Sequence, residues 1–337
     1  MGFRAKRETR LCSRPAMEGL EGRVVPATFH VSNAADLQAD VAALSNSSVP
    51  NTIMVDPGVY NLTSTLQITD AENLTIVGKT DRSGSVTLLA PNGNRAFEID
   101  GGNVTLSALT VAGGGGVDYG GGILAQNAVL TLKNATVTGN SAAVAGGGVY
   151  IVGGTLNVQS SSIVSNGTVG STNSAGGGIG ALNATVIITH GIVANNSAVS
   201  FNLDPAGTAN ASGAGIYAQG GTLTITNSSL AHNSVYAATT GTSATSLGGA
   251  GTTTNATATA SSSTITGNGL IALSAGVNST RGSAFSTNGG TLTITRSNLQ
   301  GNLPSGTAEF DHPGATVVLK NTTVDGQKLI GNRTLSS

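Results

Sequence analysis

Glu98 and Asp100 have the spacing that acid–base chemistry requires of two carboxyl groups. Residues two apart on a β-strand point to the same side and lie ~6.6 Å apart along the backbone. Glycosidases use pairs of carboxyl groups at about this separation. Arg95 precedes the pair. These three residues are therefore candidate catalytic residues of a polysaccharide lyase or a glycoside hydrolase.

Charged residues are scarce elsewhere, which weighs against catalysis. The 337 residues include 15 basic and 16 acidic side chains, or 9% charged, whereas a globular domain carries about a quarter. In residues 119–280 the charged side chains are Lys133 and Asp204. His190 and His232 have no acid nearby in the sequence and are expected in turns. We expect a non-enzymatic structural or adhesive protein without a cofactor or a metal site, and keep the lyase or hydrolase as the alternative.

Two tyrosines are candidates for sugar binding. Tyr150 and Tyr217 occupy equivalent outward positions of a repeat, on either side of Gly180. If the repeats stack as strands, the two rings lie ~10 Å apart. Exposed aromatic rings at this spacing can stack on sugars, although tyrosine also simply suits a strand. The expected partner is a polysaccharide or another cell-envelope component.

The repeat that carries these residues is a fourteen-residue window, of which GGTLTITNSSLAHN is one copy. Its copies begin at Gly101, Asn127, Gly153, Asn183, Gly220, Asn255, Gly289 and Gly314. Aliphatic residues at the fourth, sixth and eleventh positions alternate with Thr, Asn or Ser. This alternation predicts strands with one buried face. Another large apolar residue stands seven positions before the fourth in every copy except one, which has Gly251, and predicts a third short strand in each repeat.

The last position of the window is asparagine in six copies: Asn140, Asn166, Asn196, Asn233, Asn268 and Asn302. Asparagine tolerates the left-handed conformations of turns. Its side-chain amide can also hydrogen-bond to equivalent residues above and below in a stack. We expect a structural ladder at a turn rather than a set of ligand contacts.

The pattern resembles the right-handed parallel β-helix family, which includes pectate-lyase-like and bacterial surface proteins. The resemblance covers roughly residues 50–337. It implies an all-β fold, a single-stranded right-handed parallel β-helix of about eight to nine coils. The family's lyases use clusters of aspartate for Ca²⁺ and a basic residue as proton acceptor, and no such cluster maps onto this chain. The resemblance therefore implies the fold but no catalytic residue.

The repeats differ in length at one place. From each ladder asparagine to the next inward residue the intervals are 9, 13, 20, 18, 17 and 8 residues. The long segments are residues 197–215, 234–250 and 269–284. Stacked surface loops at these places would protrude on one side, which in repeat proteins is often the binding face. Their candidate ligand-binding residues are Phe201, Asp204, Tyr236 and Arg281.

A short helix is expected to cover the first coil. Residues 32–45 read SNAADLQADVAALS, with Asn33 as a possible N-cap. Leu37, Val41 and Leu44 lie on one helical face. A β-helix needs such a cover because its open end exposes backbone and core. We divide the chain into a targeting segment (1–27), a capping helix with leading strands (28–96) and the coils (97–337).

The first 27 residues are read as an address rather than as part of the fold. They hold six of the fifteen basic residues, and LEGRVVPA (residues 20–27) resembles an LE-x-R-x-x-PA motif of exported bacterial surface proteins. We therefore expect an extracellular or cell-surface protein. A net charge of −1 argues against nucleic-acid binding. No stretch approaches the roughly 18 apolar residues of a transmembrane helix.

Outward threonine pairs allow a third interpretation, an ice-binding surface. Thr222 and Thr224, like Thr257 with Thr259 and Thr291 with Thr293, are two residues apart on predicted strands. Together they would form a flat array of hydroxyl groups of the kind that ice-binding β-helices use. Threonine is also a common residue on a solvated strand face.

Overall fold

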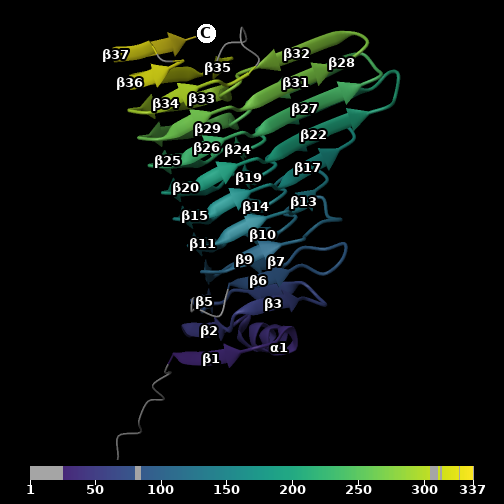
Figure 1. Ribbon diagram of the computed structural model, residues 1–337, viewed down its shortest axis with the longest axis vertical. Helices are drawn as coiled ribbons and strands as arrows, with labels where there is room; N and C mark the ends of the chain where they lie inside the picture. The colour runs from purple at the N-terminus through teal and green to yellow at the C-terminus, as the bar shows by residue number, and fades with distance from the viewer. Residues whose placement is uncertain (1–25, 80–84, 304–309, 312, 326, 337) are drawn as a thin grey trace, which may run out of the picture.

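The chain winds into a parallel β-helix (Figure 1). The structure, a computed structural model, describes residues 26–79, 85–303, 310–311, 313–325 and 327–336. Equivalent strands of successive repeats pair in parallel and without slippage. For example, Leu130 pairs with Val104 in the preceding coil and with Leu156 in the following one. This register confirms the expected parallel β-helix.

In the described residues each coil contributes to three stacks of strands. Stack I carries the buried residue that lies seven positions before the fourth of each window. It consists of β4 (Leu66–Thr69), β7 (Phe97–Asp100), β10 (Ile123–Gln126), β14 (Val149–Val152), β19 (Ile179–Leu182), β24 (Ile216–Gln219), the first parts of β29 (Gly251–Ser261) and β33 (Phe285–Thr295), and β35 (Phe310–Asp311).

Stack II carries the fourth and sixth positions of the window. It consists of β1 (Ala27–Val31), β2 (Asn51–Val55), β5 (Leu74–Gly78), β8 (Asn103–Ser107), β11 (Val129–Lys133), β15 (Thr155–Gln159), β20 (Thr185–Thr189), β25 (Thr222–Thr226), the last parts of β29 and β33, and β36 (Thr316–Val324). The final strand, β37 (Gln327–Ser336), turns back and pairs with β36 in the antiparallel sense.

Stack III carries the eleventh position. It consists of β3 (Gly58–Asn61), β6 (Val86–Leu89), β9 (Thr110–Ala112), β12 (Thr136–Thr138), β16 (Ser162–Val164), β21 (Ile192–Ala194), β26 (Ser229–Ala231), β30 (Thr264–Thr266) and β34 (Asn298–Gln300), and it continues onto the end of β36. The strands that precede residue 97 thus belong to the same stacks as the later coils.

Inward side chains of the three stacks fill the interior. The sixth-position column, from Leu106 to Leu319, is at most 3% exposed. Each fully buried aliphatic or aromatic side chain contributes about 1.5–3 kcal/mol. Gly251 has no side chain to contribute, and the ring of Phe285 in the next coil lies against it: a Cβ added at Gly251 would lie 2.6 Å from Phe285 Cε1.

The six window asparagines form a continuous hydrogen-bonded stack at the turn that follows stack III. Asn196 Oδ1 accepts from the backbone N–H of Asn166 (3.0 Å) and from Asn166 Nδ2 (3.2 Å). Asn196 Nδ2 donates to Asn233 Oδ1 (3.0 Å) and to the carbonyl oxygen of Ile163 (2.9 Å). All six side chains are buried, at 0–5% exposure. The amides therefore satisfy backbone groups that the turn would otherwise leave unpaired inside the protein.

A second polar stack lies at the turn between stacks II and III. The ninth window position is serine in four copies: Ser161, Ser228, Ser263 and Ser297. Ser263 Oγ accepts from the backbone N–H of Ser228 (3.2 Å) and donates to the carbonyl oxygen of Ser261 (2.8 Å). The residue before each serine adopts a positive φ. His190 occupies one of these left-handed positions, and His232 a similar one before a ladder asparagine, so both lie in turns as expected.

The predicted helix is present as α1 (Ala34–Leu44) at the N-terminal end of the stack (Figure 1). Asn33 is its N-cap, with Oδ1 accepting from the backbone N–H of Asp36 at 2.9 Å. Leu37, Val41 and Leu44 are buried. The helix packs these side chains against β1, β2 and β4 of the first coil. None of the described helices has the length and apolar character of a membrane span.

The long segments are strands rather than the loops expected from the sequence. Lobe sheet A consists of β13 (Ser141–Ala142), β17 (Gly167–Gly170), β22 (Ser197–Asn202), β27 (Ser234–Thr239) and β31 (Gly269–Leu273). Lobe sheet B consists of β18 (Asn173–Ala175), β23 (Thr208–Ser212), β28 (Ser243–Leu247) and β32 (Val277–Arg281). The two sheets form a lobe that projects from one side of the coils (Figure 1). Their shared core is mostly alanine, such as Ala198, Ala211 and Ala237, so the alternation in the sequence is weak.

Candidate functional site

A cleft made of three hollows runs along the outer face of stack I, and lobe sheet B borders one end of it. Its middle part is a 630 Å³ hollow bordered by Arg95, Asp118, Tyr119, Gln126 and Tyr150. A 290 Å³ hollow follows it, and there Tyr150 and Tyr217 face Asn173, Asn210 and Ser212 of lobe sheet B. At the other end a 570 Å³ hollow reaches from Glu98 to Gln38 of α1. The cleft therefore crosses several coils.

Triple glycines create the corner from which the cleft opens. Before β14 the chain reads Gly146-Gly147-Gly148, and Gly146 adopts φ +66°. A Cβ on Gly147 would lie 2.1 Å from the carbonyl oxygen of Gly167, at the base of the lobe. A Cβ on Gly148 would lie 3.0 Å from Cγ of the ladder residue Asn166. Only glycine allows the returning lobe strand to pass this close to the outgoing strand and to the asparagine stack.

The structure brings Tyr150 and Tyr217 together with a third tyrosine. Tyr150 and Tyr217 pair in register with Gly180 from its two sides. The Tyr150 ring lies over Gly180, because a Cβ there would be 2.7 Å from Tyr150 Cδ2. The ring centroids of Tyr119 and Tyr150 are 4.8 Å apart at an interplanar angle of 36°. Three aromatic side chains therefore follow the cleft along the direction in which the coils stack.

Tyr119 is not among the residues that the sequence pattern predicts for the site. It stands immediately before a triple glycine, where the next two coils have Ala145 and Ala175; in the structure Tyr119 pairs with Ala145, which pairs in turn with Ala175. The signal was present as the one large aromatic residue at an otherwise small position. Comparison of the residues that precede each glycine triplet, rather than of the strands alone, would have found it.

The Tyr150 hydroxyl is protonated at neutral pH. Burial raises the pKa of Tyr150 above its ordinary value, and the proximity of Tyr119 and Tyr217 raises it further. A raised pKa favours the neutral phenol, which can donate as well as accept a hydrogen bond. Tyr217 is also engaged, since its hydroxyl donates to Gln219 Oε1 at 3.3 Å. Tyr150 thus presents an uncharged hydroxyl to the cleft.

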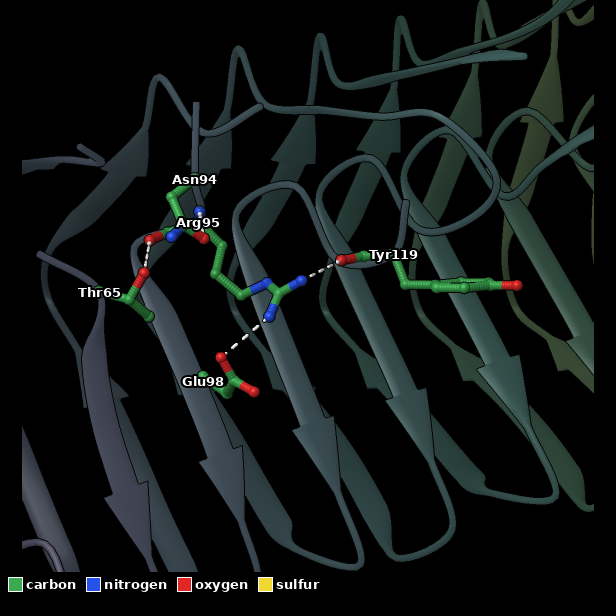
Figure 2. Close-up of polar contacts among 5 residues, drawn as sticks. All are labelled: Thr65, Asn94, Arg95, Glu98 and Tyr119. Atoms are coloured by element: carbon green, nitrogen blue, oxygen red, sulfur yellow. Dashed lines mark hydrogen bonds and ion pairs between the residues drawn. The ribbon is translucent and has the colours of Figure 1, made fainter. Parts of the chain in front are cut away.

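Arg95 joins the first candidate carboxylate to the aromatic row (Figure 2). Its Nη1 donates to Glu98 Oε2 at 3.0 Å, and its Nη2 donates to the carbonyl oxygen of Tyr119 at 3.2 Å. The Arg95 side chain is 14% exposed and that of Glu98 is 35% exposed. Thr65 Oγ1 donates to the Arg95 carbonyl oxygen at 2.9 Å. Arg95 therefore positions the segment that carries Tyr119, and its charge is offset by Glu98.

Asp100, the second candidate carboxylate, lies on the same strand but outside this contact. Its neighbour in the next coil is Gln126, which borders the cleft. In Glu98, the ion pair with Arg95 involves Oε2. Its other carboxylate oxygen, Oε1, can accept a proton or a hydrogen bond from a ligand in the cleft. Within the described ranges, no three or more His, Cys, Asp or Glu side chains are grouped so that they could hold a metal ion.

The other four candidate binding residues do not join Tyr150 and Tyr217. Phe201 (50% exposed) and Tyr236 are on lobe sheet A, and Tyr236 borders a separate hollow with Leu270 and Ile271. Asp204 Oδ1 accepts from the backbone N–H of Ala206 at 2.9 Å and so stabilises a turn. Their places follow from the lobe being two strand layers rather than loops.

Arg281 is the member of this group that lies on the cleft side of the lobe. It ends β32 and follows Ser212 and Leu247 in one outward column of lobe sheet B. Its Nε donates to Ser279 Oγ at 3.2 Å. The threonine pairs lie elsewhere: Thr222, Thr257 and Thr291 are in register on stack II, away from the cleft.

No protein-family model matches the chain, and no curated protein matches it. Among solved structures, it is similar to ORF18 of Geobacillus virus E2, with 14% sequence identity and a TM-score of 0.42 over 87% of this chain and 59% of that chain. The chain thus spans 59% of the length of the viral protein.

Two further structures are similar to it. One is a 1,3-α-1,4-β-D-galactose-4-sulfate-3,6-anhydro-D-galactose-2-sulfate 4 galactohydrolase (10% identity, TM-score 0.27, covering 81% of this chain and 72% of that one). The other is an iota-carrageenase complexed to iota-carrageenan fragments (11% identity, TM-score 0.21, covering 67% and 58%).

Proposed function

We propose that the protein is an extracellular or cell-surface module that binds a polysaccharide in the cleft without cleaving it. The observation that carries this proposal is the row of Tyr119, Tyr150 and Tyr217 along the coil-stacking direction, with amide side chains opposite. Aromatic faces offer large contact area at a small cost in conformational entropy. Amides both donate to and accept from sugar hydroxyls.

The geometry suits an extended chain rather than a single sugar. Tyr150 and Tyr217 are two coils apart, so their spacing is ~10 Å. A polysaccharide that runs parallel to the coil axis can place successive rings over these side chains. Export is supported by the LE-x-R-x-x-PA resemblance, whose residues 20–25 lie outside the described ranges. Cell fractionation tests it, and retention of the full-length chain in the cytoplasm would contradict it.

Replacing Tyr150 by alanine is expected to weaken polysaccharide binding about tenfold to thirtyfold. The reason is that loss of a central aromatic contact typically reduces the free energy of binding by about 1.4–2 kcal/mol. Tyr217→Ala is expected to have a smaller effect, since that ring lies at the end of the row. A polysaccharide array identifies the bound glycans, and calorimetric titration measures each affinity. Tyr236→Ala is the matched control, because this tyrosine lies on lobe sheet A. Equal affinities of Tyr150→Ala and Tyr236→Ala would contradict the proposed site.

A hydrolase or lyase is the second candidate, favoured by the position of Glu98 beside the aromatic row. If the protein cleaves a glycan in this cleft, Glu98→Gln is expected to reduce the rate at least about a hundredfold, as loss of a general acid or base does. Release of reducing ends or of unsaturated products from a panel of neutral and acidic polysaccharides measures this. Turnover that disappears in Glu98→Gln but persists in Glu72→Gln, an exposed matched change, would overturn the non-enzymatic proposal.

A further inference from the structure

We propose that the ligand of the cleft is an uncharged polysaccharide, and that acidic side chains at the cleft exclude uronate-rich and sulfated chains. This inference rests on the proposed function and specifies its ligand class. It follows from the charges that border the cleft, from the hydrogen-bonding groups between them, and from the aromatic rings of Tyr119, Tyr150 and Tyr217.

The groups that border the cleft have a net negative charge. In the described residues that border the three hollows, the ionised groups are Glu98, Asp118 and Arg95. Arg95 is engaged by Glu98 at 3.0 Å, so its charge is offset where it lies. Asp118 adds an exposed carboxylate, and Asp100 stands next to Gln126 in the adjacent coil. An anionic sugar between these residues therefore meets repulsion, and the one described cation that borders the hollows, Arg95, is already paired with Glu98.

The hydrogen-bonding groups also favour hydroxyls over anions. A carboxylate or sulfate on a sugar only accepts hydrogen bonds, whereas a hydroxyl both donates and accepts. The carboxylate of Asp118 can only accept, so it complements a hydroxyl and not an anion. The amides of Gln126, Asn173 and Asn210 do both, and Asn210 Nδ2 already donates to Asn173 Oδ1 at 3.3 Å. An anionic sugar group beside Asp118 would place its own acceptor oxygens against the acceptor oxygens of the carboxylate, with no donor between them.

The test compares the affinity of one neutral and one anionic class of glycan for the full-length protein. The probes are oligosaccharides of mannan and xylan on one side, and of polygalacturonate and alginate on the other, matched in length. We expect neutral oligosaccharides to bind with little salt dependence. Anionic ones should bind at least about tenfold more weakly at low salt, and the gap should narrow as salt screens the repulsion.

The variant Asp118→Asn tests whether the charge of this carboxylate causes the preference. The ratio of neutral to anionic affinity is expected to fall about fivefold, which corresponds to removing one unit charge a few ångströms away in water. Glu72→Gln removes the same charge from an exposed side chain outside the cleft, so its ratio should equal that of the wild type. A ratio for Asp118→Asn equal to that of Glu72→Gln would overturn the charge argument.

The outcomes separate this inference from the proposed function. Tighter binding of the anionic oligosaccharides, weakened by salt and lost in Tyr150→Ala, would overturn the uncharged ligand and leave the cleft as a glycan site. Binding of neither class on the full array would overturn the proposed function itself. Binding of the neutral class alone, with the expected shift in Asp118→Asn, supports both.

Discussion

Asn196→Ala is expected to lower the free energy of unfolding by about 3–5 kcal/mol, because each buried polar group left unpaired costs about 1–3 kcal/mol. The substitution removes the acceptor of the Asn166 backbone N–H and of Asn166 Nδ2, and the donor to the Ile163 carbonyl oxygen. Asn196 is fully buried. Water therefore cannot readily replace the lost partners.

Urea denaturation followed by circular dichroism measures this effect. Asn157→Ala is the matched control: Asn157 is half-buried on stack II, and its Nδ2 makes a 3.4 Å contact with Thr131 Oγ1. That substitution should change stability by less than about 0.5 kcal/mol, as surface substitutions usually do. If the two variants unfold at the same urea concentration, the asparagine stack does not stabilise the coils as described. Amide exchange should also quicken first in the coils next to Asn196, since each repeat contacts only its neighbours.

Gly147→Ala is expected to destabilise the protein by about 3 kcal/mol, at the upper end of what added methyl groups cost in packed structure. The new Cβ would lie 2.1 Å from the Gly167 carbonyl oxygen and 2.5 Å from that of Gly177. Both obstacles are backbone atoms of the lobe and the next coil, so they cannot move aside as a flexible side chain would. Because Gly147 lies at the corner below Tyr150, glycan affinity should fall as well.

A second glycine separates this clash from the general effect of a glycine-to-alanine change. At Gly269, an added Cβ meets nothing within 4 Å, and φ is outside the left-handed region. Gly269→Ala is therefore expected to be neutral or to stabilise by about 0.4–1 kcal/mol through the unfolded chain. Thermal and urea unfolding of the two variants provide the comparison. A Gly147→Ala protein as stable as the wild type would show that the corner tolerates a side chain.

The coil architecture could be predicted because its signal repeats. A single alternation such as that around Leu132 is weak, but the same positions recur in successive windows and pair in one register. Helix α1 was also predictable, since the Asn33 cap and the Leu37–Val41–Leu44 face are local features. Both results rest on short-range patterns that the folded structure uses without change.

The lobe and the complete site were not predictable in the same way. The inward residues of the lobe, such as Ala211 and Ala237, bury little apolar area each, so their strands resemble polar loops in sequence. The cleft depends on how the lobe meets stack I, which is a tertiary relationship across the glycine corner. Tyr119 joins Tyr150 only through that corner, whereas Phe201 and Tyr236 are carried onto the other sheet.

The glycine corner and the asparagine stack have a consequence for how such a protein can be altered. Each excursion leaves the coils beside a ladder asparagine and returns at the corner, and these end points hold their register while the connection varies from 8 to 20 residues. Stability and recognition are thus encoded in separate residues of one repeat. A different lobe segment could therefore be inserted between the ladder asparagine and the glycine corner of a single coil, to change the residues that border the cleft, while the buried interior of that coil stays unchanged.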